Sequence, residues 1–98
     1  MKPLKLNAAA KTDLRKIAQY SVSEFGRTVA DRYMTGLSIA FDRIALSPET
    51  YRIFEGVVPE TRVLSYRRHR IFYRIDPNDV LVLRILHQFR DLERLDWQ

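Results

Sequence analysis

Residues 62–87 read RVLSYRRHRIFYRIDPNDVLVLRILH, and this stretch decides the fold. Apolar and polar residues alternate along 62–67 and again along 69–75, which predicts two strands joined by a tight turn. The Asp-Pro-Asn-Asp sequence at 76–79 predicts a four-residue turn. Six of the eight residues in 80–87 are apolar, as expected of a strand buried on both faces. The stretch therefore predicts a three-stranded antiparallel meander.

The preceding residues predict one short strand and a first helix. Residues 4–6 alternate and predict an edge strand. Asn7 is suited to cap the helix that follows, and Gly26 to end it without a steric penalty. One set of residues in this helix recurs at helical spacing and is expected to face the core. Its members are Leu14, Ile17, Ala18, Ser21 and Phe25.

A second helix is predicted to begin at Thr28 and to end before Ser47-Pro48, and residues 48–60 are expected to form a loop. Thr28 and Asp31 resemble a capping box. Gly36 lies inside this helix, where glycine costs about 1 kcal/mol relative to alanine, so we expect it to mark close approach to the first helix. The fold predicted for residues 1–98 is a single α+β domain. A helical hairpin packs on one face of a mainly antiparallel sheet, in the order β-αα-βββ.

Composition excludes several classes of protein. The 98 residues include no cysteine, which rules out disulfides and thiolate chemistry. No stretch resembles a signal peptide or a membrane span, so we expect a soluble cytoplasmic protein. No metal-ligand spacing or glycine-rich phosphate loop is present. We therefore expect no metal and no cofactor.

Positive charge is concentrated in residues 62–75, and the chain as a whole carries a net charge of +5. No acidic residue occurs in this segment before Asp76, so the arginines are expected to lack a local neutralising partner. Such a segment attracts an acidic partner or a phosphate backbone, although a solvated strand face gives the same pattern. The basic residues are Arg62, Arg67, Arg68, His69, Arg70 and Arg74.

The last strand carries two further polar residues, Arg84 and His87. Strict alternation would place Val80, Val82, Arg84 and Leu86 on one face of this strand. An arginine in an apolar run needs a partner or an uncovered face. Asp91 is the nearest candidate partner and would pin the C-terminal residues to the sheet; binding to a target is the alternative. His87 is expected to anchor the strand end, since no second group is clearly placed for acid–base catalysis.

Several motifs together resemble the ParE branch of the RelE/ParE toxin superfamily. Ala10-x-x-Asp13-Leu14-x-x-Ile17-x-x-Tyr20, Phe25-Gly26 and Ala30-x-x-Tyr33 are similar to the helical hairpin of that family. His69-x-Ile71-Phe72-Tyr73-Arg74 and Val82-Leu83-Arg84-Ile85-Leu86-His87-x-x-x-Asp91 are similar to its sheet signature. The resemblance covers roughly residues 4–95 and implies the fold predicted above.

The resemblance also implies a function. ParE-type toxins are neutralised by an antitoxin encoded beside them, here expected to be ParD-like, and are associated with inhibition of DNA gyrase without catalysis. The RelE branch instead cuts mRNA on the ribosome; in this chain His87 with Arg62, Arg67 and Arg84 would have to serve that chemistry. A third alternative is a relative that has lost toxicity and acts only in an antitoxin complex.

We accordingly expect a hetero-oligomer with the antitoxin and no catalytic residue. The expected contact residues for antitoxin or target are Arg67, Arg70, Arg74, Arg84 and His87.

Overall fold

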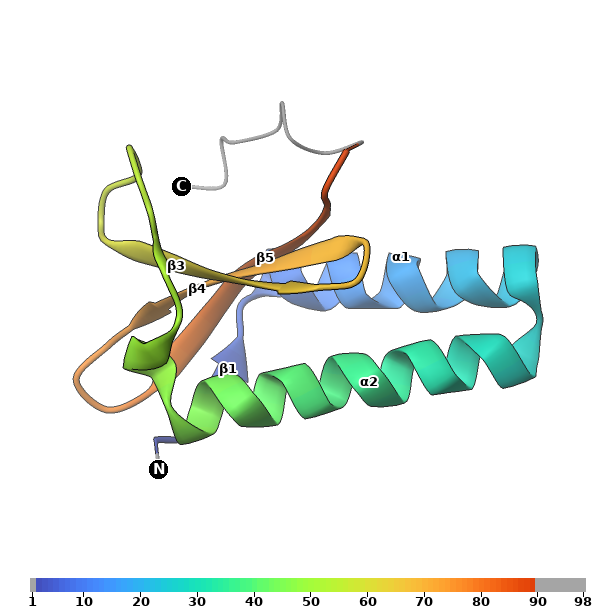
Figure 1. Cartoon of the computed structure of the whole chain (residues 1–98), viewed down its shortest axis with the longest axis horizontal. Coiled ribbons are helices and arrows are strands. Elements are labelled where there is room, and N and C mark those ends of the chain that lie inside the picture. Colours follow the sequence, from blue (N-terminus) through green and yellow to red (C-terminus); the bar gives the residue numbers. More distant parts are fainter. Residues whose placement is uncertain (1, 90–98) are drawn as a thin grey trace.

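The computed structural model describes residues 2–89, which form a sheet with a helical hairpin packed on one of its faces (Figure 1). The elements are β1 (Leu4–Leu6), α1 (Ala8–Phe25), α2 (Arg27–Leu46), a 3-10 turn (Pro48–Thr50), β2 (Ile53–Phe54), β3 (Thr61–Tyr66), β4 (His69–Ile75) and β5 (Val80–His87). The predicted α+β class and the order of its elements are confirmed.

Within the described residues the strands follow the order β1-β5-β4-β3-β2. Strands β3, β4 and β5 form the predicted antiparallel meander, and β1 lies parallel to β5 at the edge. The prediction of a plain loop over 48–60 is wrong, because this segment contains a 3-10 turn and β2. A strand of two residues is too short to show the alternation of apolar and polar residues by which strands are predicted from sequence. Strand β2 is defined by its pairing with β3, in which Ile53 lies opposite Arg62.

Both ends of α1 agree with the sequence. The Asn7 side chain accepts a hydrogen bond of 2.9 Å from the Ala10 N–H, and Gly26 ends the helix with φ 83°. The capping box predicted at Thr28 is wrong, because α2 begins at Arg27 with Gly26 as its N-cap. One glycine therefore ends the first helix and starts the second, which leaves Thr28 inside α2.

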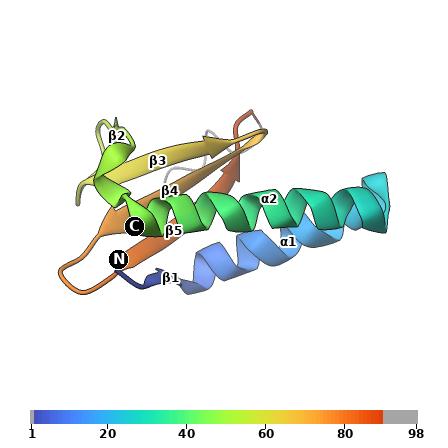
Figure 2. The same cartoon turned by 60° about the horizontal axis from the view of Figure 1, so that its bottom comes forward.

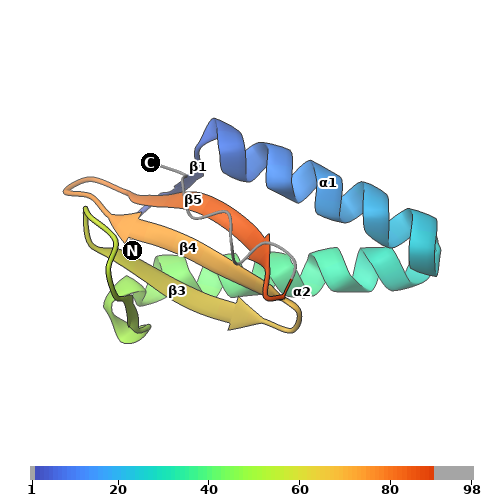
Figure 3. The same cartoon turned by 90° about the horizontal axis from the view of Figure 1, so that it is seen from above.

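The hairpin is longer than the sheet that it covers. In all three overall views the connected ends of α1 and α2 project beyond the strands (Figures 1, 2 and 3). We call this projecting part, residues 20–30, the overhang. Phe25 was expected to face the core but is exposed, since no strand lies beneath it. The overhang presents four exposed large apolar side chains, namely Tyr20, Val22, Phe25 and Val29.

A β-bulge in β5 divides the apolar residues of the strand between two cores. Phe72 lies opposite Arg84 while Tyr73 lies opposite Val82, so Leu83 is the extra residue. A shift of one residue reverses the direction of every later side chain. Ile85 therefore joins Val80 and Val82 on the helix side, and Leu86 joins Phe72 on the opposite face. The prediction that Val80, Val82, Arg84 and Leu86 share one face is wrong beyond the bulge.

The helix-side core explains why α2 contains a glycine. A Cβ atom at position 36 would overlap the hydroxyl group of Tyr66 on β3. Gly36 thus marks close approach to the sheet, and the expectation that it marks approach to the first helix is wrong. Tyr66 also packs edge-on against Tyr33 of α2, with 5.1 Å between the ring centroids.

Replacing Gly36 by alanine is expected to destabilise the fold. The gain in helix propensity is about 1 kcal/mol, whereas overpacking costs about 1–3 kcal/mol. Urea unfolding would measure the difference, with Ser38→Ala as the control at an exposed position of the same helix. The cost should shrink in a Tyr66→Leu background; an equal cost in both backgrounds would contradict the assignment of the clash to Tyr66.

Candidate interaction site

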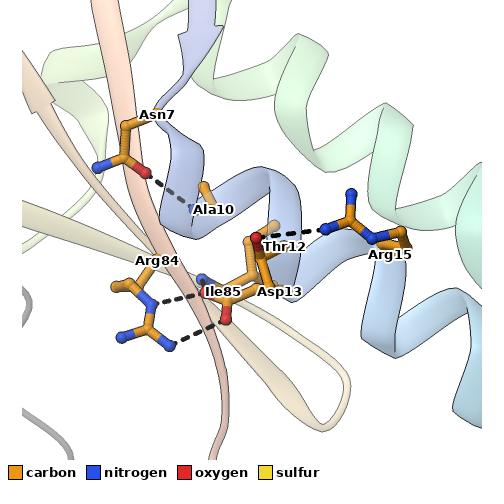
Figure 4. A network of polar contacts seen from close by, with 7 residues as sticks. All are labelled: Asn7, Ala10, Thr12, Asp13, Arg15, Arg84 and Ile85. Atoms are coloured by element: carbon orange, nitrogen blue, oxygen red, sulfur yellow. Dashed lines mark hydrogen bonds and ion pairs between the residues drawn. The ribbon is translucent and has the colours of Figure 1, made fainter.

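Asp13 of α1 binds β5 through three hydrogen bonds (Figure 4). The Arg84 guanidinium donates from Nε to Oδ2 at 2.7 Å and from an Nη atom to Oδ1 at 2.9 Å. The backbone N–H of Ile85 donates to Oδ2 at 2.9 Å. Such a two-pronged, charge-assisted contact is among the stronger hydrogen-bonding arrangements in proteins. We call it the Asp13 clamp.

The position of the clamp follows from the short length of β1. Strand β1 pairs with β5 only as far as Val82, and the Asn7 N–H then donates to the Val82 carbonyl at 3.0 Å. The chain turns into α1 at that point, so β1 does not continue along the outer edge of β5. The Asp13 carboxylate accepts the N–H of Ile85 on that edge, where a longer β1 would have supplied a carbonyl group.

The sequence did not point to Asp13 as a partner of Arg84. Asp91, the partner expected from proximity in the chain, lies outside the described residues. Asp13 is 71 residues away from Arg84 in the sequence, so local sequence patterns could not predict their contact. The one available signal was that Asp13 and Arg84 both belong to the motifs that carry the family resemblance.

A groove of about 490 Å³ lies between the overhang and the turn that joins β3 to β4. One wall is apolar and comes from the helices, and the other is basic and comes from the sheet. Its lining residues are Tyr20, Ser21, Phe25, Val29, Tyr33, Arg67, Arg68, His69 and His87.

The two arginines of the basic wall occupy the tight turn itself. Tyr66 pairs with His69, so Arg67 and Arg68 form a two-residue connection, and β3 ends one residue earlier than predicted. Arg67 has φ 50°, a conformation that is uncommon outside glycine. Its guanidinium carbon lies 5.7 Å from the centre of the Tyr66 ring, within the range of a cation–π contact.

Next to the β3–β4 turn, one tyrosine of α2 and two histidines of the sheet connect the helical layer with the sheet. The Tyr33 hydroxyl and His69 Nδ1 are hydrogen bonded at 2.6 Å, and burial raises the pKa of Tyr33 above its usual value. His69 lies opposite His87 across β4 and β5, with 5.4 Å between the ring centroids. His87 Nδ1 accepts the N–H of Phe89 at 3.2 Å, just beyond the end of β5.

The remaining arginines of the basic segment lie elsewhere. Arg70 and Arg74 project from the sheet face opposite the helices, the face that carries Phe72. Arg74 donates to Asp76 at 3.0 Å, so the expectation that it lacks a local neutralising partner is wrong. Arg62 donates to the carbonyl groups of Glu49 and Tyr51. The five expected contact residues are thus divided: Arg67 and His87 line the groove, whereas Arg70, Arg74 and Arg84 do not.

Residues 4–92 match the model of the family described as ParE toxin of type II toxin-antitoxin system, parDE. The chain belongs to the ParE toxin family. Curated ParE relatives agree with this assignment. Toxin ParE1 of Mycobacterium tuberculosis is 33% identical over 90 residues, which is 91% of this chain and 92% of the relative. Toxin ParE of Escherichia coli is 30% identical over 88 residues, covering 89% and 85% of the two chains.

Solved structures show the same ParE-like fold. A chain of the chromosomal ParDE system from P. aeruginosa superposes with a TM-score of 0.77 at 20% identity, covering 89% of this chain and 96% of that one. A chain of the RelBE2 toxin–antitoxin complex of Mycobacterium tuberculosis superposes with a TM-score of 0.62 at 19% identity, covering 88% and 90%. Across residues 2–89, neither helix is long and apolar enough to span a membrane, and no cluster of candidate metal ligands occurs.

Removal of the Asp13 clamp should be costly. Asp13→Ala leaves the largely buried Arg84 side chain and the Ile85 N–H without this acceptor, and breaking such a pair costs about 3 kcal/mol. Asp31→Ala is the matched control, because the Asp31–Arg27 pair is exposed on both sides and such pairs contribute about 0.5 kcal/mol or less. Urea unfolding would compare the two variants. Equal losses of stability would show that the clamp contributes no more than a surface ion pair.

Proposed function

We propose that this chain is the toxin of a cytoplasmic type II toxin–antitoxin pair, that it inhibits DNA gyrase by binding, and that a cognate ParD-like antitoxin neutralises it. The observation that carries the proposal is the match to the ParE toxin family over residues 4–92. The relatives that are 30–33% identical over about nine tenths of the chain bear the name ParE or ParE1.

Action by binding rather than catalysis is supported by the contacts of the arginines. An mRNA endonuclease would require His87 to work with Arg62, Arg67 and Arg84, because arginines would have to stabilise the charge of the reacting phosphate. Arg84 is held in the Asp13 clamp, and Arg62 donates to the carbonyl groups of Glu49 and Tyr51, in and directly after the 3-10 turn. Of these three arginines, only Arg67 lines the groove with His87.

An antitoxin partner is supported by the shape and chemistry of the groove. A small domain with contiguous exposed apolar side chains presents a surface that favours association. The exposed apolar residues of the overhang adjoin two arginines, so the groove suits a segment that carries both apolar and acidic side chains. The proposed assembly is accordingly a hetero-oligomer of toxin and antitoxin.

The direct test is a supercoiling assay with purified toxin and gyrase. Inhibition that disappears on addition of the antitoxin is expected. A folded His87→Ala variant is expected to keep its inhibitory activity, because His87 is assigned to the strand end rather than to a reaction. Gyrase that is unaffected, together with ribosome-dependent cleavage of mRNA that is lost in folded His87→Ala, would replace this proposal with the endonuclease function.

Association with the antitoxin should depend on the charge of the β3–β4 turn. Replacing Arg67 and Arg68 by glutamate reverses the field at the groove, and the association rate should fall about tenfold or more at low salt. Surface plasmon resonance at several ionic strengths would measure it, with Arg43→Glu/Arg52→Glu as a control of equal charge change at exposed positions away from the groove. If the control slows association as much, net charge rather than the groove governs the encounter.

A further inference from the structure

The groove contains both histidines of the chain, His69 and His87. They lie opposite each other on β4 and β5, and their rings meet edge-to-face with 5.4 Å between the centroids. Histidine is the side chain whose charge ordinarily changes between about pH 5 and pH 8. Two imidazolium ions this close would repel each other, so the pair takes up one proton more readily than two. The hydrogen bonds of the two rings determine which one receives it.

The Tyr33 hydroxyl allows His69 to take up a proton without losing a hydrogen bond. When His69 is neutral with its proton on Nε2, the hydroxyl donates to Nδ1 over 2.6 Å. When Nδ1 is protonated, it becomes the donor and the hydroxyl oxygen accepts. The hydroxyl proton then has another acceptor, because the Tyr66 carbonyl oxygen lies 3.5 Å from the Tyr33 oxygen. Burial raises the pKa of Tyr33, so the hydroxyl keeps its own proton in both arrangements.

The hydrogen bond of His87 works against protonation. Its Nδ1 atom accepts the backbone N–H of Phe89 at 3.2 Å, and a backbone N–H can only donate. The proton of the neutral ring is therefore on Nε2, and a second proton would have to bind Nδ1. Protonation of His87 breaks its bond to Phe89, whereas protonation of His69 preserves the bond to Tyr33. The pair therefore favours a proton on His69.

The charged residues around His69 in the groove are basic. Arg67 and Arg68 are exposed on the same wall, and neither forms an ion pair within residues 2–89. No acidic residue of the described chain lines the groove. The other titratable neighbours are Tyr20 of α1, Tyr33 of α2, Tyr66 of β3 and His87 of β5. Like charge from the arginines disfavours a protonated His69 in the free chain, and a carboxylate entering the groove would reverse that balance.

We propose that His69 takes up a proton when a carboxylate of the partner enters the groove, and that the protonated ring joins Arg67 and Arg68 in binding it. The inference rests on the proposed function, in which the partner is the apolar and acidic segment of the antitoxin. It gives a binding role to His69, which was not among the contact residues expected from the sequence. Because binding takes up a proton, the complex tightens as the pH falls.

The size of the pH effect follows from that single proton. A carboxylate at ion-pair distance stabilises the protonated form of an imidazole and raises its pKa by about one unit. The dissociation constant Kd should therefore be severalfold lower at pH 6 than at pH 8, with a limit of about tenfold. The tightening is complete below the pH at which the free ring is protonated, and it is lost as the pH rises through the range where the bound ring releases its proton. Arginines stay charged throughout.

Isothermal titration calorimetry of the complete toxin with its antitoxin, at pH 7 in two buffers of different ionisation enthalpy, measures the proton uptake. Wild type and His87→Gln are expected to take up a proton on binding, whatever the effect of the substitution on affinity. The uptake should be lost in His69→Gln. It should be reduced in Tyr33→Phe, which keeps the ring but removes the hydroxyl that accepts from Nδ1. Comparison of the variants removes the contribution of groups that titrate elsewhere in the complex.

Nuclear magnetic resonance of the free toxin provides a second readout, because the two histidine rings can be assigned from the variants. As the pH falls, His69 should become protonated before His87. The reverse order, or uptake that is lost in His87→Gln and kept in His69→Gln, would overturn the inference. Circular dichroism checks the fold of each variant, and Tyr33→Phe serves as the test if His69→Gln does not fold.

The calorimetry also separates this inference from the proposed function. Binding of the antitoxin with equal proton uptake in wild type, His69→Gln and Tyr33→Phe would overturn the role of His69 and leave the toxin–antitoxin pair intact. An antitoxin that does not bind at any pH would overturn the proposed function, and this inference with it.

Discussion

The structure depends on one electrostatic contact, the Asp13 clamp. The sheet is extended on one side by β1, which is only three residues long and leaves the rest of the outer edge of β5 without a strand. A carboxylate on α1 accepts the Ile85 N–H on that edge and pairs with the neighbouring Arg84. Because the two partners are largely buried, the pair is screened less than a surface pair would be. The clamp therefore adds a directional polar contact between α1 and β5 to the apolar packing of the helices on the sheet.

The position of the helical hairpin on the sheet determines where the candidate interaction surface lies. Helix α1 starts beside the outer edge of β5 and has 18 residues, so its last turns extend past the sheet. The apolar residues of the overhang consequently have no strand beneath them, and the β3–β4 turn forms the facing wall with Arg67 and Arg68. The groove is thus a consequence of a helix longer than its sheet, and its mixed apolar and basic lining suits a partner segment of the opposite charge.

Local patterns predicted most of the fold, and long-range contacts account for what they missed. Asn7, Gly26 and the alternation of β3 and β4 act within a few residues, so their effects were visible in the sequence. The bulge at Leu83 arises from pairing between strands, and strict alternation therefore misplaced Leu86. The clamp joins two residues that are 71 positions apart in the sequence, and the groove brings Phe25 and Arg67 together from different elements. Periodicity within one element cannot predict either contact. The resemblance to a known family predicted that the chain is a toxin, whereas the chemistry of its individual residues did not.

Hydrogen exchange at the Ile85 amide tests the central claim most directly, because this N–H lies on an edge of β5 that β1 does not reach. If Asp13 takes the place of a neighbouring strand, the Ile85 amide will exchange as slowly as amides inside β4 under native conditions, and in folded Asp13→Ala it will lose protection while β4 keeps it. An Ile85 amide that exchanges rapidly in the wild type, with β4 fully protected, would contradict the claim that the clamp completes the sheet.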